Sequence, residues 1–278
     1  VTHWDTAESY EGGRSEEGIG LFFKKNPDTR QQVFLVTKSY DNTRAAQVFD
    51  EHLNQSLKRM NTSYIDLWFV HSLTTIDEFN KPHIKAWAEK AKAEGKIKYF
   101  GFSTHKNMEE ILLAAAKLNW VDAIMMTYNY RLMYNQKMKD AIKACHEAGI
   151  GMTAMKTMGG GPVKLDGDGD TTMADHFLKQ GYSAEQAKLK AVWSDDRIAN
   201  ICSQMPNLAI LSANSAAHGL HGRHAYARLV ARARELFAAL PTEGLDGLSA
   251  GELARAEKRC PQGLAIGRLL HEAKESLA

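Results

Sequence analysis

Residues 33–71 read VFLVTKSYDNTRAAQVFDEHLNQSLKRMNTSYIDLWFVH. The stretch holds two short runs, VFLVTK (33–38) and IDLWFVH (65–71), which are mostly apolar on both faces. The segment between them carries apolar residues at near-helical spacing, at Val48, Phe49, Leu53 and Leu57. Runs that are apolar on both faces are typical of strands buried in a parallel sheet. We therefore predict a strand–helix–strand unit.

The same alternation continues along most of the chain. Five further apolar runs are VTHW (1–4), YFGFS (99–103), AIMMTY (123–128), IGMTAMK (150–156) and IANICSQ (198–204). Helices are predicted after Ser15 as an N-cap and over segments 44–60, 83–94, 106–118, 136–148 and 183–193. Seven strand–helix units predict a (β/α)8 TIM barrel. Because the chain starts within a strand, we expect the first strand of that barrel to be missing.

Composition places the chain among ordinary globular proteins. Of its 278 residues, 44% are hydrophobic and 24% are charged, and the net charge is +2. This balance favours no nucleic-acid partner and no membrane partner, and it leaves the oligomeric state open. The three cysteines, Cys145, Cys202 and Cys260, are far apart in the sequence. That spacing indicates a reducing compartment, so a cytoplasmic location is expected.

Most of the predicted strands end in a polar or ionisable residue. These residues are Asp5, Lys38, His71, Ser103, Tyr128 with Asn129, Lys156 and Gln204. The carboxyl ends of barrel strands converge on one mouth, where the active sites of such barrels lie. The alternative interpretation is that strands simply give way to polar loops. An Asp, a Lys and a His on three successive strands favour the functional interpretation.

Asp5, Tyr10, Lys38 and His71 together predict proton transfer to a carbonyl oxygen. A lysine cation beside a tyrosine stabilises the phenolate, and Asp5 would keep that lysine charged and oriented. A neutral imidazole at His71 would hydrogen-bond the carbonyl oxygen and direct it at the phenol. Side chains supply no hydride, so the arrangement implies a nicotinamide cofactor and requires no metal.

Several segments of the chain resemble the aldo/keto reductase family. They are DTAESYEGGRSEEGIG (5–20), VFLVTKS (33–39), LNQSLKRMNTSYIDLWFVHS (53–72), GKIKYFGFSTH (95–105) and DAIMMTYNYRL (122–132). The resemblance implies a barrel that transfers hydride between NAD(P)H and a small aldehyde or ketone. It also implies that Tyr10 is the general acid, that Lys38 and Asp5 tune it, and that His71 orients the substrate. Because it runs to about residue 217, we divide the chain into a barrel, 1–217, and a helical C-terminal extension, 218–278.

The resemblance also implies a set of cofactor-binding residues. It places Ser103 and Thr104 at the nicotinamide carboxamide, and its further cofactor positions are Asn129, Lys156, Gln204 and Asn207. The family's glutamine and stacking aromatic fall on Met125 and Met155, which depart from the pattern. No Lys or Arg occurs between Arg197 and Arg223, where an NADP 2′-phosphate would require cations. We expect NADPH, and NADH stays open.

The last stretch of the chain, KRCPQGLAIGRLLHEAKESLA (258–278), resembles the tail of a subgroup with a ferredoxin-like cysteine run. If Cys260 is the final ligand, the other ligand positions fall on Ala250, Leu253 and Ala256. We therefore expect no iron–sulfur cluster, and no metal site elsewhere. The connection 157–182 is expected to be a long loop beside the mouth.

A second interpretation comes from another class of protein. It is a non-catalytic barrel that binds a nucleotide or a protein partner. The changed cofactor positions, Met125 and Met155, favour it. The four intact groups Asp5, Tyr10, Lys38 and His71 argue against it.

Overall fold

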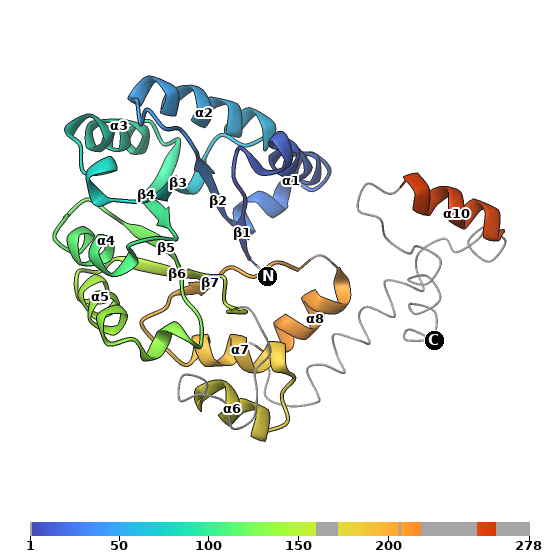
Figure 1. Cartoon of the computed structure of the whole chain (residues 1–278). Helices are drawn as coiled ribbons and strands as arrows, with labels where there is room; N and C mark the ends of the chain where they lie inside the picture. Colours follow the sequence, from blue (N-terminus) through green and yellow to red (C-terminus); the bar gives the residue numbers. More distant parts are fainter. Residues whose placement is uncertain (1, 160–171, 206, 218–248, 260–278) are drawn as a thin grey trace. The chain divides into compact units, whose positions relative to one another are not determined.

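A computed structural model describes residues 2–159, 172–205, 207–217 and 249–259 of the chain. The chain divides into two compact units, Val1–Met205 and Pro206–Ala278. The strands that the structure describes all belong to the first unit (Figure 1). The division predicted between residues 217 and 218 stays a prediction.

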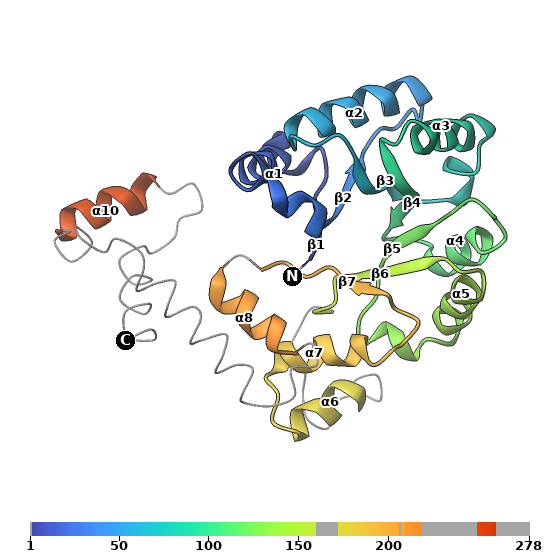
Figure 2. The same cartoon turned by 180° about the vertical axis from the view of Figure 1, so that it is seen from behind.

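Among the described residues, seven parallel strands form one sheet, in which they neighbour one another in sequence order. They are β1 (His3–Asp5), β2 (Phe34–Ser39), β3 (Ile65–Leu73), β4 (Ile97–Thr104), β5 (Ala123–Thr127), β6 (Gly151–Met155) and β7 (Asn200–Ile201). The sheet curls, and its helices lie on the outside in both opposite views (Figures 1 and 2). The prediction of a parallel α/β barrel with one strand fewer than eight is therefore confirmed.

Helices connect the strands close to where the sequence predicts them. They are α1 (Arg14–Lys25), α2 (Ala46–Arg59), α3 (Pro82–Ala93), α4 (Met108–Ala115), α5 (Gln136–Glu147) and α7 (Ala184–Trp193). Polar caps begin two of them. The Asn135 side chain accepts the backbone N–H of Met138 in α5, and Ser183 forms a capping box with Gln186 in α7.

Two local predictions are wrong. Ser15 is not an N-cap, because α1 begins at Arg14 after a left-handed Gly13, and the Ser15 hydroxyl instead accepts a hydrogen bond from Thr6. The connection 157–182 is not all loop, because it contains α6 (Thr172–Lys179). Within α6, Ala174 is buried in a small apolar cluster against which Met173 and Phe177 also pack, and this burial stabilises the helix. Residues 160–171 of this connection lie outside the described part.

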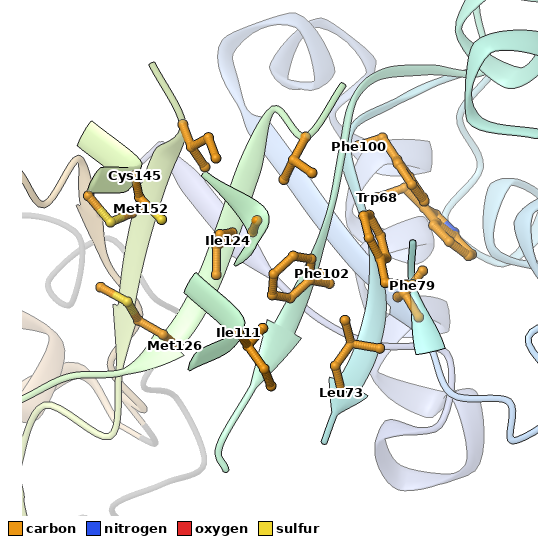
Figure 3. Packing of buried hydrophobic residues seen from close by; sticks show 14 of the residues in the cluster. Trp68, Leu73, Phe79, Phe100, Phe102, Ile111, Ile124, Met126, Cys145 and Met152 are labelled. Atoms are coloured by element: carbon orange, nitrogen blue, oxygen red, sulfur yellow. The ribbon is translucent and has the colours of Figure 1, made fainter. Parts of the chain in front are cut away.

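The curled sheet separates two apolar layers. On the outer face, Trp68 stacks on Phe100 with 5.9 Å between ring centroids, and both are fully buried beneath the helices (Figure 3). Inside the barrel lies a smaller cluster, made of Val36, Leu67, Phe69, Ala123, Met125 and Met155. Side chains alternate between faces along a strand. Lys38 and His71 therefore lie on the same face as this inner cluster.

The second unit contains α8 (Leu208–Ala217) and α10 (Ala250–Arg259). Asn207 precedes α8, and its side chain accepts the backbone N–H of Ile210 at 2.9 Å. Cys260 and the tail that follows it lie outside the described residues. Within the described part of the chain, no helix is both long and apolar enough to cross a membrane.

Candidate active site

Three neighbouring strands carry Asp5, Lys38 and His71. β1 ends at Asp5, which is in register with Val36 of β2, and Lys38 of β2 is in register with Phe69 of β3. His71 follows Phe69 by two residues and so points to the same face. Because the strands are parallel, their carboxyl ends meet at one mouth.

Lys38 and Asp5 form a buried ion pair. The Lys38 Nζ donates to Asp5 Oδ2 at 2.6 Å and to the Thr6 carbonyl oxygen at 2.7 Å. The Lys38 side chain is only 1% exposed, and that of Asp5 is 11% exposed. A buried ammonium is stable when a carboxylate and a carbonyl compensate its charge. These contacts hold the cation in one place at the mouth.

Tyr10 stands over this cation. It begins the short 3-10 helix η1 (Tyr10–Gly13), directly after the loop that follows β1, and it is 40% exposed. Its ring centroid lies 5.0 Å from Lys38 Nζ and 5.9 Å from the His71 ring centroid, which it meets edge-on. The predicted catalytic residues, Asp5, Tyr10, Lys38 and His71, are therefore brought together.

His71 is uncharged at neutral pH. Burial lowers the pKa of His71 to about 4, and the nearby Lys38 and Arg44 cations act in the same direction. In the described part of the structure, its buried Nδ1 has no hydrogen-bond partner. A neutral imidazole at this place can donate a hydrogen bond without bringing a positive charge to the substrate.

A pocket of about 940 Å³ opens beside these residues. It is lined by Asp5, Tyr10, Glu11, Ser15, His105, Met125, Thr127, Asn129, Met155, Lys156, Thr157, Met158, Gly159, Cys202, Ser203, Gln204 and Met205. Three of the predicted cofactor residues, Asn129, Lys156 and Gln204, are among them. The two methionines at the departing positions, Met125 and Met155, also line it.

The other predicted cofactor residues do not line this pocket. The Ser103 hydroxyl accepts the backbone N–H of Ser72, and the Thr104 hydroxyl donates to the Leu73 carbonyl. Both side chains are fully buried and bind the neighbouring strand β3. Asn207 belongs to the second unit, where it directly precedes α8. A cofactor role for these three residues stays a prediction.

Lys156 follows β6 in an uncommon backbone conformation, with a φ of 56°. Its carbonyl oxygen accepts from the Asn129 side chain at 3.3 Å and from the Gly159 backbone at 3.0 Å. A Cβ on Gly159 would lie 2.8 Å from the Tyr130 ring, so only glycine fits this turn. The turn leaves the Lys156 side chain exposed in the pocket lining.

Two residues at the mouth were not predicted from the sequence, and one residue predicted to lie at the mouth is part of the core. The Tyr40 ring meets the His71 ring edge-on at 6.2 Å, and the Cys202 thiol lies 3.5 Å from Asp5 Oδ2. Tyr40 stands two residues after Lys38, and that spacing was the available signal. Tyr128 is core instead, because its hydroxyl is buried and donates to Asp195 at 2.7 Å. Among the described residues, no cluster of His, Cys, Asp and Glu is arranged to hold a metal ion.

Known proteins resemble the chain over most of the barrel unit. The model of the Aldo/keto reductase family matches residues 1–209. Aldo-keto reductase AMT2 of Alternaria alternata is 26% identical over 204 residues, which cover 61% of this chain and 54% of AMT2. Aldo-keto reductase yakc of Schizosaccharomyces pombe, named with NADP(+), is 29% identical over 171 residues, covering 58% of this chain and 49% of yakc. The chain thus spans about half the length of the curated relatives it matches.

A solved structure shows the same fold. An aldo-keto reductase from Klebsiella pneumoniae in complex with NADPH superposes with a TM-score of 0.61 at 21% identity, over 82% of this chain and 78% of that one. The family match covers well over half of the sequence, and the predicted catalytic residues gather at the mouth of a barrel of the same fold. The chain therefore belongs to the aldo/keto reductase family.

Proposed function

We propose that this chain transfers hydride between NADPH and the carbonyl group of a small aldehyde or ketone. The observation that carries the proposal is the convergence of Tyr10, the Lys38–Asp5 ion pair and the neutral His71 on one mouth. This is a device for protonating a carbonyl oxygen while its carbon accepts hydride. The named reductases among the relatives support it. They do not favour the alternative of a non-catalytic barrel.

The residues that line the pocket fit the hydride-donating end of a nicotinamide cofactor. Met125 and Met155 are buried and offer thioethers against which a flat ring can pack. Lys156 is exposed in the same lining and offers a cation to a phosphate group. NADP(+) in the name of the yeast relative and NADPH in the Klebsiella structure support NADPH over NADH. When bound, the nicotinamide supplies the hydride.

The chain's own residues perform the proton transfer. The substrate oxygen would lie between Tyr10 and His71, where the neutral imidazole donates a hydrogen bond that orients the carbonyl. The Tyr10 hydroxyl gives its proton to that oxygen as the carbon accepts hydride. Lys38 then compensates the negative charge left on Tyr10, and Asp5 holds Lys38 in place.

Two measurements test this proposal. Titration of the protein with NADPH and then NADH, followed by nicotinamide fluorescence, should show micromolar binding of NADPH. Tyr10→Phe should abolish reduction of a panel of aldehydes and ketones, because the proton donor is gone, while NADPH binding stays within about twofold. Turnover equal to that of the unmodified protein would overturn the mechanism. Absence of binding by either nucleotide would favour the non-catalytic alternative.

A further inference from the structure

The loop that carries Tyr10 has an unusual backbone conformation. Three successive residues have positive φ, with values of 53° at Glu11, 64° at Gly12 and 97° at Gly13. Glycine adopts the left-handed region without steric cost, so of the three only Glu11 carries backbone strain. Hydrogen bonds within the loop, such as that from the Gly12 N–H to the Ser9 carbonyl oxygen at 3.2 Å, give it its local shape, and contacts from outside fix where it places Tyr10.

The first part of the loop is tied to β2. The backbone N–H of Thr6 donates to the Val36 carbonyl at 2.9 Å, and that of Glu8 donates to the Lys38 carbonyl at 3.1 Å. These two bonds extend the sheet pairing as far as Glu8. The loop beyond Glu8 is the part that presents Tyr10.

Arg59, in the last turn of α2, contacts the loop on both sides of Tyr10. Its Nη1 donates to the Glu8 carbonyl oxygen at 3.2 Å, two residues before Tyr10. Its guanidinium also packs on Gly13, three residues after Tyr10, where an added Cβ would lie 2.6 Å from Arg59 Cζ. One planar group thus contacts both ends of the segment 8–13.

The guanidinium is itself held by Glu16, whose side chain is fully buried. Glu16 Oε2 lies 3.4 Å from Arg59 Nη1, and Glu16 Oε1 accepts the Thr37 hydroxyl at 2.7 Å. Thr37 immediately precedes Lys38 in β2. The contacts therefore run from β2 through Glu16 and Arg59 to the Tyr10 loop, and they tie the phenol to the strand that carries its cation.

We propose that Arg59 is a positioning residue that holds Tyr10 in reach of Lys38 and His71. The inference rests on the proposed role of Tyr10 as proton donor. Arg59 does not line the pocket, so it acts through the loop and not through direct contact with substrate. A displacement of the reacting group by about 1 Å can cost on the order of 100-fold in rate. The loss should therefore fall on kcat.

The test compares Arg59→Met, Arg59→Lys and Arg59→Ala with a control, Lys58→Met, which removes an exposed cation from the preceding position of the same helix. With NADPH and 4-nitrobenzaldehyde, Arg59→Met should lower kcat by about 10- to 100-fold, with NADPH affinity within about twofold. Arg59→Lys should lose less, and ethylguanidinium should restore part of the rate to Arg59→Ala. Lys58→Met should match the unmodified protein.

A second measurement needs no turnover. A 3-fluorotyrosine placed at position 10 should give one sharp fluorine resonance in the otherwise unmodified protein and a shifted or broadened one in Arg59→Met. If the unmodified protein reduces no carbonyl, the proposed function fails and the resonance alone decides the positioning role. An unchanged resonance together with a kcat within about threefold of the unmodified value would overturn the inference. So would a fall in NADPH affinity as large as the fall in kcat.

Discussion

The two sides of the barrel mouth are built in different ways. On the β1–β3 side, Asp5, Lys38 and His71 are mostly buried, and a lysine pinned by two short hydrogen bonds supports the phenol. On the β5–β7 side, the pocket has two flexible methionines and an exposed Lys156. The difference teaches that the side proposed to transfer the proton is held in one geometry, whereas the side proposed to bind the cofactor is adaptable. Substitutions on the first side should affect chemistry and folding, and substitutions on the second should affect affinity.

Lys38→Met should have the largest effect on both kcat and the free energy of unfolding. A small effect would contradict the contrast between the two sides of the mouth. We expect kcat to fall by about 10³-fold because Tyr10 loses its cation. The free energy of unfolding should fall by about 3 kcal/mol, because Asp5 is left as an uncompensated buried charge. Steady-state kinetics and urea denaturation measure the two losses. The control is Lys98→Met on β4, whose ammonium is mostly exposed, and its unfolding free energy should change by less than about 1 kcal/mol.

The low pKa of His71 predicts a second effect on stability. Because burial holds that pKa near 4 in the folded protein, the unfolded chain binds the proton first as pH falls below about 6.5. Stability that is present above pH 6.5 should therefore be lost progressively down to pH 4, by about 3 kcal/mol. His71→Gln should flatten this component in urea titrations at several pH values. The exposed His146→Gln is the control, and equal slopes for the two variants would contradict the assignment.

Lys156→Met should have the smallest effect of the three variants, and it tests whether the β5–β7 side of the mouth affects affinity more than chemistry. Loss of a cation from the pocket lining should weaken NADPH binding by about tenfold, with kcat changed by less than about threefold. Fluorescence titration at two salt concentrations should show that NADPH binding depends less on salt in Lys156→Met than in the unmodified protein. Lys137→Met, an exposed lysine at the start of α5, serves as the control. A fall in kcat that exceeds the loss of affinity would place Lys156 in the chemistry instead.

The part of the site that follows from periodicity was predictable from the sequence. Asp5, Lys38 and His71 end strands whose apolar runs mark both the fold and the mouth. Tyr10 lies on a loop, and its role was predicted from the chemistry of a tyrosine beside Lys38, Asp5 and His71 and from the family resemblance, not from periodicity. Its geometry depends on Arg59, which is distant in the sequence and carries no local signal.

Other features could not be predicted because they depend on packing and register. Whether the hydroxyls of Ser103 and Thr104 face the pocket or the β3 backbone is a matter of hydrogen bonding between strands. Cys202 meets Asp5 only because the curled sheet brings its two edge strands near each other.

That meeting of edge strands has a consequence for how the protein would lose activity. Among the described residues, β1 is hydrogen-bonded in the sheet only to β2, and it is three residues long. A short edge strand opens by local fluctuation far more often than the whole fold unravels. On warming, the amides of β1 should exchange with solvent early, and Asp5 would leave Lys38 while the other strands stay assembled. The proposed reductase activity would then be lost at temperatures at which the protein is still almost entirely folded.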